Sequence, residues 1–213
     1  MFTGLIEKIC SIKSMRPGND SMVITVDIAD LAQECRIGDS IAINGVCLTV
    51  SKINGVLAEF DVSSETLSKT SLGKLQISSK VNIERAMKPT GRFGGHFVLG
   101  HVDGTAKIEK IDKKGEFVDI KFSADSELIS SMVEKGSVAI NGISLTVFDL
   151  GKNSFHTAII PQTLNNTTLG YAKIGDLVNI ETDIIIKAVK KQLEYILPQK
   201  DKLTAEKLRE LGF

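Results

Sequence analysis

The side chains best suited to proton transfer or nucleophilic attack lie in two nearly identical segments. Residues 42–50 read AINGVCLTV and residues 139–147 read AINGISLTV, so Cys47 of the first segment is replaced by Ser144 in the second. A thiol and a hydroxyl both become nucleophiles when a neighbouring base removes their proton. Only a few per cent of a free thiol is ionised at pH 7, and no cationic residue is near Cys47 in sequence. We therefore expect Cys47 to position a ligand.

Each of these residues is followed by a threonine on the same face of a predicted strand. Neighbouring side chains of a strand point to opposite faces, so Cys47 shares a face with Thr49, and Ser144 shares one with Thr146. Such a pair facing the interior of a barrel is either a half-polar core pair or a surface that hydrogen-bonds a heterocycle. Because both copies have the pair, we favour the polar lining.

Other differences between the two copies introduce charge or a titratable group. His101 replaces a leucine of the first copy, Asp183 replaces an alanine, and Gln162 replaces Glu65. An imidazole with an unperturbed pKa of about 6.5 can carry protons at neutral pH, although a single histidine is more often structural. Lys135 is a solvated loop lysine on spacing alone. The three histidines have no carboxylate or cysteine at ligand spacing, so we expect no metal site.

The duplication extends well beyond these motifs. Three separated segments keep one offset, which indicates two copies of one domain, each large enough for its own core. We place the first domain at residues 1–97 and the second at residues 98–186. The segments that recur 97 positions later are AINGVCLTV, ETLSKTSLG (residues 65–73 and 162–170) and VNIE (residues 81–84 and 178–181).

Short alternating or β-branched runs, separated by Gly, Asn-Gly and Asp-Gly turns, predict an all-β fold. We expect an antiparallel barrel of about six strands in each copy, because closure leaves no open edge. Short helices are predicted at equivalent positions, residues 28–35 and 126–134. The predicted strands span residues 22–28, 40–50, 57–62, 118–122, 138–148, 155–160 and 177–186.

From about residue 184 the apolar period changes from two to nearly four, which predicts an amphipathic helix. Pro198 is expected to end it, and Leu203 to Phe213 form a second short amphipathic helix. We assign residues 187–213 to this C-terminal helical segment. Its apolar stripe could lie across a barrel or pack on the same helix of a neighbouring subunit, and both arrangements stay open. The stripe consists of Ile185, Val189, Leu193 and Ile196.

The bulk properties restrict the partners and the compartment. Basic and acidic residues both total 26, so no net charge attracts the chain to nucleic acid or to an anionic membrane. A small, roughly neutral ligand fits this balance. The three cysteines give no disulfide framework, and no apolar stretch approaches the roughly 18 residues of a membrane span. The N-terminus lacks the pattern of a secretory signal, and we expect a cytoplasmic protein.

Seven segments together carry a resemblance to a known family. MFTG at the N-terminus, NGVCLTV, ETL, GGHFVLGHVDG, KGSVAINGISLTV, IIPQTL and TTLG resemble the riboflavin synthase family, in order and over nearly the whole chain. The resemblance implies two tandem six-stranded Greek-key barrels and a C-terminal helix that gathers subunits into a homotrimer. Each active site would lie between the first barrel of one subunit and the second barrel of another.

The resemblance also implies the reaction. Two molecules of 6,7-dimethyl-8-ribityllumazine exchange a four-carbon unit and give riboflavin and 5-amino-6-ribitylaminouracil, with no cofactor and no metal. The donor loses a proton from its 7-methyl group, and the acceptor is attacked at the equivalent ring carbon. Either barrel could hold the donor, and either water or an enzyme group could add to the acceptor. Some relatives associate with lumazine synthase, which makes that capsid enzyme a candidate partner.

The residues of the site follow from the same resemblance. Ser144 and His101 are expected to assist proton removal or nucleophile addition, Thr146 and Lys135 to orient the pteridine, and Asp183 to tune them. With Cys47, these six form the expected catalytic set. The first-barrel pocket is expected to contain Gly4, Leu5, Ile6, Cys47, Leu48, Thr49, Asp61, Val62, Ser63, Ser64, Glu65 and Thr66. The second-barrel pocket is expected to contain Gly100, His101, Val102, Lys135, Ser144, Leu145, Thr146, Ile159, Ile160, Pro161, Gln162, Thr163 and Leu164.

A non-catalytic lumazine or flavin antenna protein with the same duplicated barrel is the competing interpretation. Such proteins resemble the enzyme most in the first barrel and lose polar site residues in the second. Here His101, Lys135, Ser144 and Thr146 are all present, which favours the enzyme. A flavin-dependent reductase would need a further nucleotide-binding domain. A chain of 213 residues has no room for one after two barrels.

Overall fold

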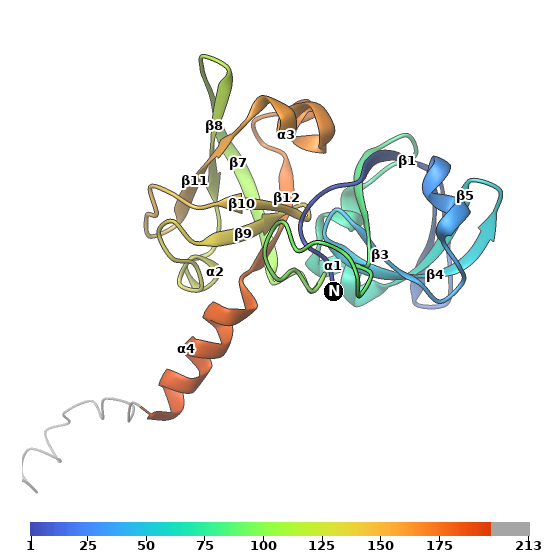
Figure 1. The fold of residues 1–213 in the computed structure, drawn as a ribbon, viewed down its shortest axis with the longest axis horizontal. Helices are drawn as coiled ribbons and strands as arrows, with labels where there is room; N and C mark the ends of the chain where they lie inside the picture. Colours follow the sequence, from blue (N-terminus) through green and yellow to red (C-terminus); the bar gives the residue numbers. More distant parts are fainter. Residues whose placement is uncertain (197–213) are drawn as a thin grey trace, which may run out of the picture.

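The computed structural model describes residues 1–196, which form two six-stranded β domains side by side (Figure 1). The strands of the first domain are β1 (Lys8–Pro17), β2 (Ser21–Asp27), β3 (Ser40–Ile43), β4 (Val46–Asn54), β5 (Leu57–Ser63) and β6 (Lys80–Arg85). They close into an antiparallel barrel in the order β1-β2-β5-β4-β3-β6. Strands β3, β4 and β5 follow one another as neighbours and β6 returns beside β3, which is Greek-key topology.

The second domain repeats this arrangement. Its strands are β7 (Gly104–Lys114), β8 (Phe117–Ser123), β9 (Ser137–Ile140), β10 (Ile143–Thr146), β11 (Ser154–Ile159) and β12 (Leu177–Thr182). Their order, β10-β9-β12-β7-β8-β11, is the circular order of the first barrel. The segment that follows β10 meets the edge strand β11 at an antiparallel bridge between Phe148 and His156. The predicted fold of two six-stranded Greek-key domains is confirmed.

Each long predicted strand around an Asn-Gly pair is a hairpin of two strands. The backbone of Asn44 (φ 46°) and Gly45 (φ 77°) is left-handed at both turn positions, as a tight two-residue hairpin turn requires. The helical predictions were partly wrong, because the segment at 28–35 is a 3-10 helix and α2 is short. The helical elements of the two domains are η1 (Ala29–Glu34), α1 (Ser64–Lys69), η2 (Ser71–Lys74), α2 (Ser126–Ile129), α3 (Pro161–Asn166) and η3 (Thr168–Tyr171).

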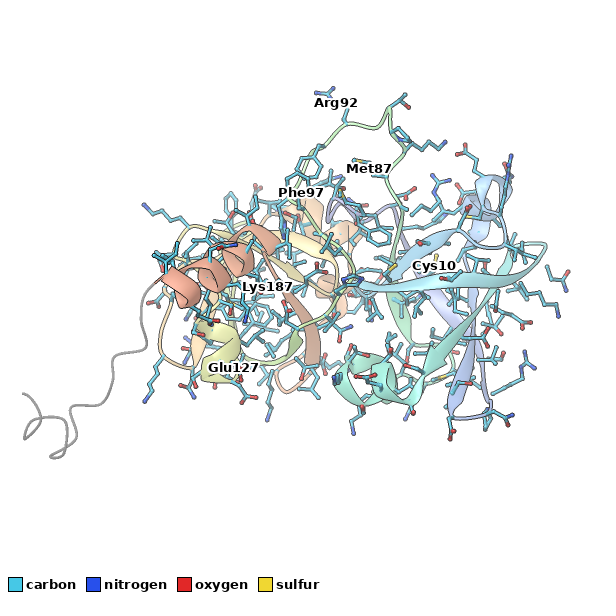
Figure 2. The ribbon with its side chains drawn as sticks, turned by 90° about the horizontal axis from the view of Figure 1, so that it is seen from below. Cys10, Met87, Arg92, Phe97, Glu127 and Lys187 are labelled. Carbon is cyan, nitrogen blue, oxygen red and sulfur yellow. The ribbon has the colours of Figure 1, made fainter. Side chains whose placement is uncertain are left out.

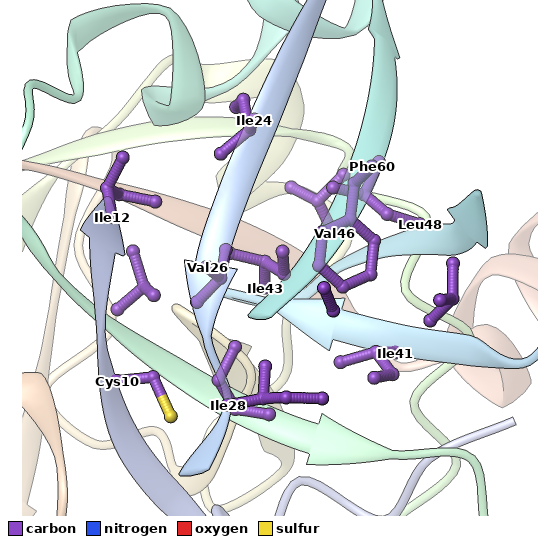
Figure 3. Close-up of a cluster of buried hydrophobic side chains, with 14 of the residues drawn as sticks. Cys10, Ile12, Ile24, Val26, Ile28, Ile41, Ile43, Val46, Leu48 and Phe60 are labelled. Atoms are coloured by element: carbon purple, nitrogen blue, oxygen red, sulfur yellow. The ribbon is translucent and has the colours of Figure 1, made fainter. Parts of the chain in front are cut away.

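Each barrel has its own core. In the first, alternate residues of the strands, such as Ile12, Ile24 and Phe60, point inward and are fully buried (Figure 3). In the second, Phe122 and Phe155 stack with ring centroids 5.2 Å apart. Because the two cores are separate, each copy of the repeat forms its own domain and the strands do not mix in one sheet.

The repeated Asn-Gly turns hold the two barrels together. The Asn82 side-chain amide donates to the Asn141 carbonyl (2.9 Å), and the Asn179 amide donates to the Asn44 carbonyl (2.8 Å). A Cβ atom at Gly45 would lie 2.6 Å from a backbone nitrogen of the opposite turn, so glycine is required at this contact. The motif that predicted a turn therefore also forms the interface between the domains.

The helix α4 (Ile184–Ile196) projects from the end of β12, away from both barrels (Figure 1). Its apolar stripe is exposed, from 47% at Leu193 to 70% at Ile196. The stripe is therefore not covered by a barrel of the same chain. No helix within residues 1–196 is long and apolar enough to cross a membrane. The predictions for Pro198 and for Leu203 to Phe213 lie outside the described residues.

Candidate active site

The central feature of the site is a hydroxyl paired with a buried imidazole. Ser144 Oγ lies 2.7 Å from His96 Nδ1. Burial lowers the pKa of His96, although the nearby Asp183 carboxylate opposes this by favouring the protonated form. The imidazole is therefore neutral at pH 7 and can accept a proton from the Ser144 hydroxyl. Sequence reasoning considered His96 only as a metal ligand and missed this pair.

Two glycines make room for the pair. A Cβ atom at Gly95 would lie 1.9 Å from the Thr3 carbonyl oxygen and 3.2 Å from the Ser144 Cβ. A Cβ atom at Gly4 would lie 2.6 Å from the same Ser144 Cβ. The backbone nitrogen of His96 also donates to the Thr3 carbonyl (3.1 Å). The GGH sequence was thus the signal for His96, because it marks backbone that passes directly beneath a functional side chain.

Beside this pair, a hollow of about 330 Å³ opens on the outer surface of the second barrel. This is within the usual range for a small-molecule site. Five of its residues belong to the predicted site, whereas Phe148 and Ala158 were missed. The hollow is lined by Ser144, Leu145, Thr146, Phe148, Ala158, Ile160 and Thr163.

The two predicted pockets were divided wrongly between the barrels, because the chain crosses over at the start of each copy. The Gly4 carbonyl accepts from Ser144 N (2.8 Å) in the second barrel, and the Gly100 carbonyl accepts from Cys47 N (2.9 Å) in the first. Ile6 packs against the second core, and Val102 packs against the first. Residues 4–6 therefore belong to the second-barrel site and residues 100–102 to the first-barrel site.

Two buried carboxylates hold the crossing segments in place. Glu84 accepts hydrogen bonds from the backbone nitrogens of Thr3 (2.7 Å) and Gly4 (3.0 Å). Glu181 accepts the equivalent bonds from residues 99 and 100. Burial raises the pKa of both carboxyl groups, and these hydrogen bonds oppose the rise by stabilising the charged form. A buried glutamate therefore fixes the crossing segment in each of the two copies.

The predicted strand faces were also reversed. Leu48, Val62 and Ile159 are buried in the barrel cores, so their side chains cannot line an outer site. Cys47 is partly exposed and Thr49 is exposed. The cause is simple, since the leucines and valines of LTV fill the core and leave the polar residues outside. The polar lining exists, but it covers the outer wall of the barrel.

The structure gives His101 a different neighbour from the predicted one. His101 is exposed and directly follows Gly100, whose backbone contacts Cys47. It therefore lies at the first-barrel site, and His96 takes the place beside Ser144 that was predicted for His101. Asp183 lies between β12 and α4, where its carboxylate accepts from Ile185 N (2.8 Å). Burial lowers the pKa of His96 and the negative charge of Asp183 opposes this, which the sequence did not predict. The tuning of Ser144, His101, Thr146 and Lys135 by Asp183 stays a prediction.

Lys135 has an unusual backbone. Its φ angle is 63°, whereas the equivalent position of the first copy, 97 residues earlier, is Gly38 with φ 94°. A lysine in this conformation carries strain that a glycine would avoid, and such strain concentrates at functional sites. The nitrogen of Lys135 donates to the Val147 carbonyl (2.8 Å), which places the exposed lysine beside the end of β10.

The remaining predicted residues lie where β5 and β11 turn into short helices. Ser63 caps α1 by accepting from Thr66 N (3.1 Å), and Pro161 occupies the first turn of α3. The exposed residues in these two turns are Asp61, Ser63, Ser64, Glu65, Ile160, Pro161 and Gln162, while Thr66, Thr163 and Leu164 are partly buried. In the second domain, Ile160 and Thr163 line the same hollow as Ser144.

No group of three or more His, Cys, Asp or Glu side chains among residues 1–196 is placed to hold a metal ion. The three cysteines are free. Burial raises the pKa of Cys10 to about 11, which makes that thiol inert at neutral pH. The side chains at the hollow can transfer a proton, through the Ser144–His96 pair, and can form hydrogen bonds through Thr146 and Thr163.

The connector between the domains, residues 86–97, arches away from the barrels through Met87 and Arg92 before it reaches Phe97 (Figure 2). Phe93 and Phe97 contact each other with ring centroids 4.6 Å apart, and both are about 40% exposed. With Met1 and Leu5, they form an exposed apolar rim on the crossing segments. Since Gly4 and His96 contact Ser144, this rim borders the second-barrel site.

The crossed, duplicated barrels and the outer hollow beside the Ser144–His96 pair define a tandem small-molecule-binding protein. The family model described as "Lumazine binding domain" matches the chain twice, at residues 3–86 and 99–183. Curated riboflavin synthases from Actinobacillus pleuropneumoniae and Bacillus subtilis (strain 168) are 41% and 42% identical to it, over 100% of each chain. The Escherichia coli (strain K12) riboflavin synthase is 38% identical over 94% of this chain and 95% of its own. The chain belongs to the riboflavin synthase family.

Solved structures share the fold at lower identity. The crystal structure of LumP complexed with 6,7-dimethyl-8-(1'-D-ribityl) lumazine has a TM-score of 0.77 and 23% identity, and it covers 85% of this chain and 99% of that chain. LumP complexed with riboflavin gives a TM-score of 0.77 and 24% identity with the same coverage. These likenesses support the tandem-barrel architecture.

Proposed function

We propose that this protein catalyses the dismutation of two molecules of 6,7-dimethyl-8-ribityllumazine into riboflavin and 5-amino-6-ribitylaminouracil, as a transferase of a four-carbon unit. The observation that carries the proposal is the Ser144–His96 pair at the edge of the outer hollow on the second barrel. Membership of the riboflavin synthase family supplies the substrate class.

The first chemical step is proton removal from the 7-methyl group of the donor. His96 Nδ1 takes the hydroxyl proton of Ser144 while the Ser144 oxygen takes the methyl proton. In sum, one proton moves from the substrate to the imidazole, and the negative charge spreads over the pteridine ring. General-base catalysis of this kind contributes about 10²- to 10⁴-fold. Thr146 and Lys135 orient the ring of this substrate.

The second substrate is the acceptor, which is attacked at its equivalent ring carbon. Two equivalent outer faces on one duplicated scaffold suit two identical ligands, and their unequal residues, such as Cys47 against Ser144, suit unequal roles. Holding both rings in a reactive orientation contributes about 7–11 kcal/mol in favourable cases. Cys47 and His101 lie together on the first-barrel side, where they position this second ligand.

A second copy of the chain completes the site in this proposal. The exposed stripe on α4 supports assembly into a homotrimer, because a helix with one uncovered apolar face requires a partner surface. The exposed rim of Met1, Leu5, Phe93 and Phe97 beside the hollow supports closure by a neighbouring subunit. The cytoplasm, which keeps the three free thiols reduced, is the proposed location, and lumazine synthase is the proposed further partner.

The experiment that tests the proposal is incubation of the purified chain with 6,7-dimethyl-8-ribityllumazine alone. Growth of riboflavin absorbance with one riboflavin formed per two lumazines consumed is the expected result. Tight binding of lumazine without conversion would instead assign the chain to the antenna proteins. A matched reaction with Ser144→Ala excludes a contaminating enzyme.

A further inference from the structure

Phe148 is an aromatic residue on the wall of the second-barrel hollow, and no role described above includes it. Its ring is half-buried and faces the imidazole of His156, with ring centroids 5.5 Å apart and planes tilted by 49°. An aromatic side chain at the edge of a hollow offers a flat apolar surface to a planar ligand. The surroundings of Phe148 decide whether that surface is fixed.

His156 is hydrogen-bonded to one carboxylate and lies near a second. Its Nδ1 atom lies 2.8 Å from Asp119 Oδ1, and its Nε2 atom lies 3.6 Å from Asp149 Oδ2. The other oxygen of Asp119 lies 2.7 Å from Lys114 Nζ. Burial alone would raise the pKa of Asp119, but the hydrogen bonds from Lys114 and His156 outweigh it and lower the pKa. Asp119 is thus ionised at neutral pH and fixes the imidazole that Phe148 contacts.

The backbone adds a second constraint. Phe148 N donates to the His156 carbonyl (2.9 Å), and His156 N donates to the Phe148 carbonyl (2.8 Å). This pair is the bridge that joins the segment after β10 to the edge strand β11 of the second domain. Phe148 is therefore tied to the seam of the barrel through its backbone and through its ring, which makes it a preorganised wall.

The first copy lacks this arrangement. The equivalent residues, 97 positions earlier, are Ser51 and Glu59. Ser51 is exposed, and its hydroxyl donates to the Glu59 carbonyl (3.1 Å). The Glu59 carboxylate is engaged by Arg16 at 2.9 Å. An aromatic wall is thus present in the second copy and replaced by a small polar residue in the first.

We propose that Phe148 contacts the pteridine ring in the second-barrel hollow and makes that hollow the tighter of the two lumazine sites, with His156 as the residue that positions its ring. The inference deepens the proposed function and rests on lumazine as the ligand. It assigns the unequal affinity of two otherwise similar sites to one pair of residues. Replacement of Phe148 by an apolar residue that has no aromatic ring should therefore reduce the difference in lumazine affinity between the two sites.

The test is calorimetric titration of the full chain carrying Ser144→Ala with 6,7-dimethyl-8-ribityllumazine, because the unmodified chain is proposed to convert this ligand during the titration. We expect two classes of site in the Ser144→Ala chain, to which the following substitutions are added. Phe148→Ala should weaken the tighter class by about five-fold or more, the effect of losing one stacked aromatic side chain, and leave the weaker class unchanged. Phe148→Tyr should restore it, His156→Gln should give an intermediate loss, and Ser51→Ala is the matched control that should change neither class.

Phe148→Leu guards against loss of folding, since it keeps apolar volume at the seam while removing the ring. Unchanged affinity in both Phe148→Ala and Phe148→Leu, with riboflavin still formed by the unmodified chain, overturns this inference alone. An unmodified chain that binds two lumazines without forming riboflavin contradicts the proposed reaction. In that case the lumazine affinities of the Phe148 variants still show whether the Phe148 ring contacts the ligand. A chain that binds no lumazine overturns both.

Discussion

Ser144 Oγ lies 2.7 Å from His96 Nδ1, although the two residues are 48 positions apart and belong to different parts of the chain. The contact exists because the segment Gly94–Phe97 passes beneath β10 before it crosses toward the first barrel. A buried neutral imidazole and a hydroxyl in this geometry form a base with its proton relay.

Replacement of His96 by asparagine should lower the rate of riboflavin formation by about 10²- to 10⁴-fold, because an amide keeps a hydrogen bond to Ser144 but cannot accept its proton. The substrate affinity should change little. Steady-state kinetics that separate kcat from KM provide the measurement. An unchanged kcat would show that His96 is structural.

The pH profile should reflect the lowered pKa of His96. Because the neutral form is active, activity should persist as the pH falls below about 6.5, the ordinary value for an imidazole, and be lost only through the lower pKa of the folded state. The free energy of unfolding should depend on pH in the same direction. Because folding lowers the pKa of His96, its contribution to stability is complete above about pH 6.5 and is lost as the pH falls through the folded-state pKa. An acid limb of kcat/KM centred above 6.5 would contradict this assignment.

Substitution of Gly95 by alanine should destabilise the fold by about 1–3 kcal/mol and abolish activity, because the new Cβ would lie 1.9 Å from the Thr3 carbonyl oxygen. Urea unfolding measures the loss. Gly104→Ala is the matched control, since a Cβ there meets only Leu128 at 3.6 Å. Equal stability of the two variants would refute the close-packing argument.

The apolar stripe on α4 should be required for assembly. Leu193→Glu places a charge in the stripe and should shift the chain from trimer to monomer, with loss of most activity because each site lacks its second subunit. Light scattering coupled to size-exclusion chromatography gives the mass. The exposed neighbour Gln192, changed to glutamate, adds the same charge outside the stripe and should leave the trimer intact. A Leu193→Glu trimer would remove α4 from the interface.

Much of the fold could be predicted from the repeat. A constant offset of 97 residues between motifs required two similar domains, and the turn and strand patterns set their class. Alternation told which side chains share a face, yet it could not tell which face is inside, so Cys47 was placed in the interior. Core packing decides which face points inward, because Leu48 and Val50 fill the interior of the barrel.

The crossover of the two starting segments was not predictable in the same way. A repeat suggests that each copy folds on itself, whereas Gly4 contacts Ser144 and Gly100 contacts Cys47 of the opposite copy. In the structure, the buried carboxylates of Glu84 and Glu181 hold these segments in place. His96 was hidden for the same reason, since its partner lies across the domain boundary.

Single-turnover formation of riboflavin at saturating lumazine shows whether Ser144 takes part in proton removal. We expect Ser144→Ala to bind lumazine at two sites but to form riboflavin at least about 100-fold more slowly than the unmodified chain. Cys47→Ser should retain substantial activity, because the thiol positions a ligand and does not attack it. A Ser144→Ala chain with an undiminished rate would contradict the account.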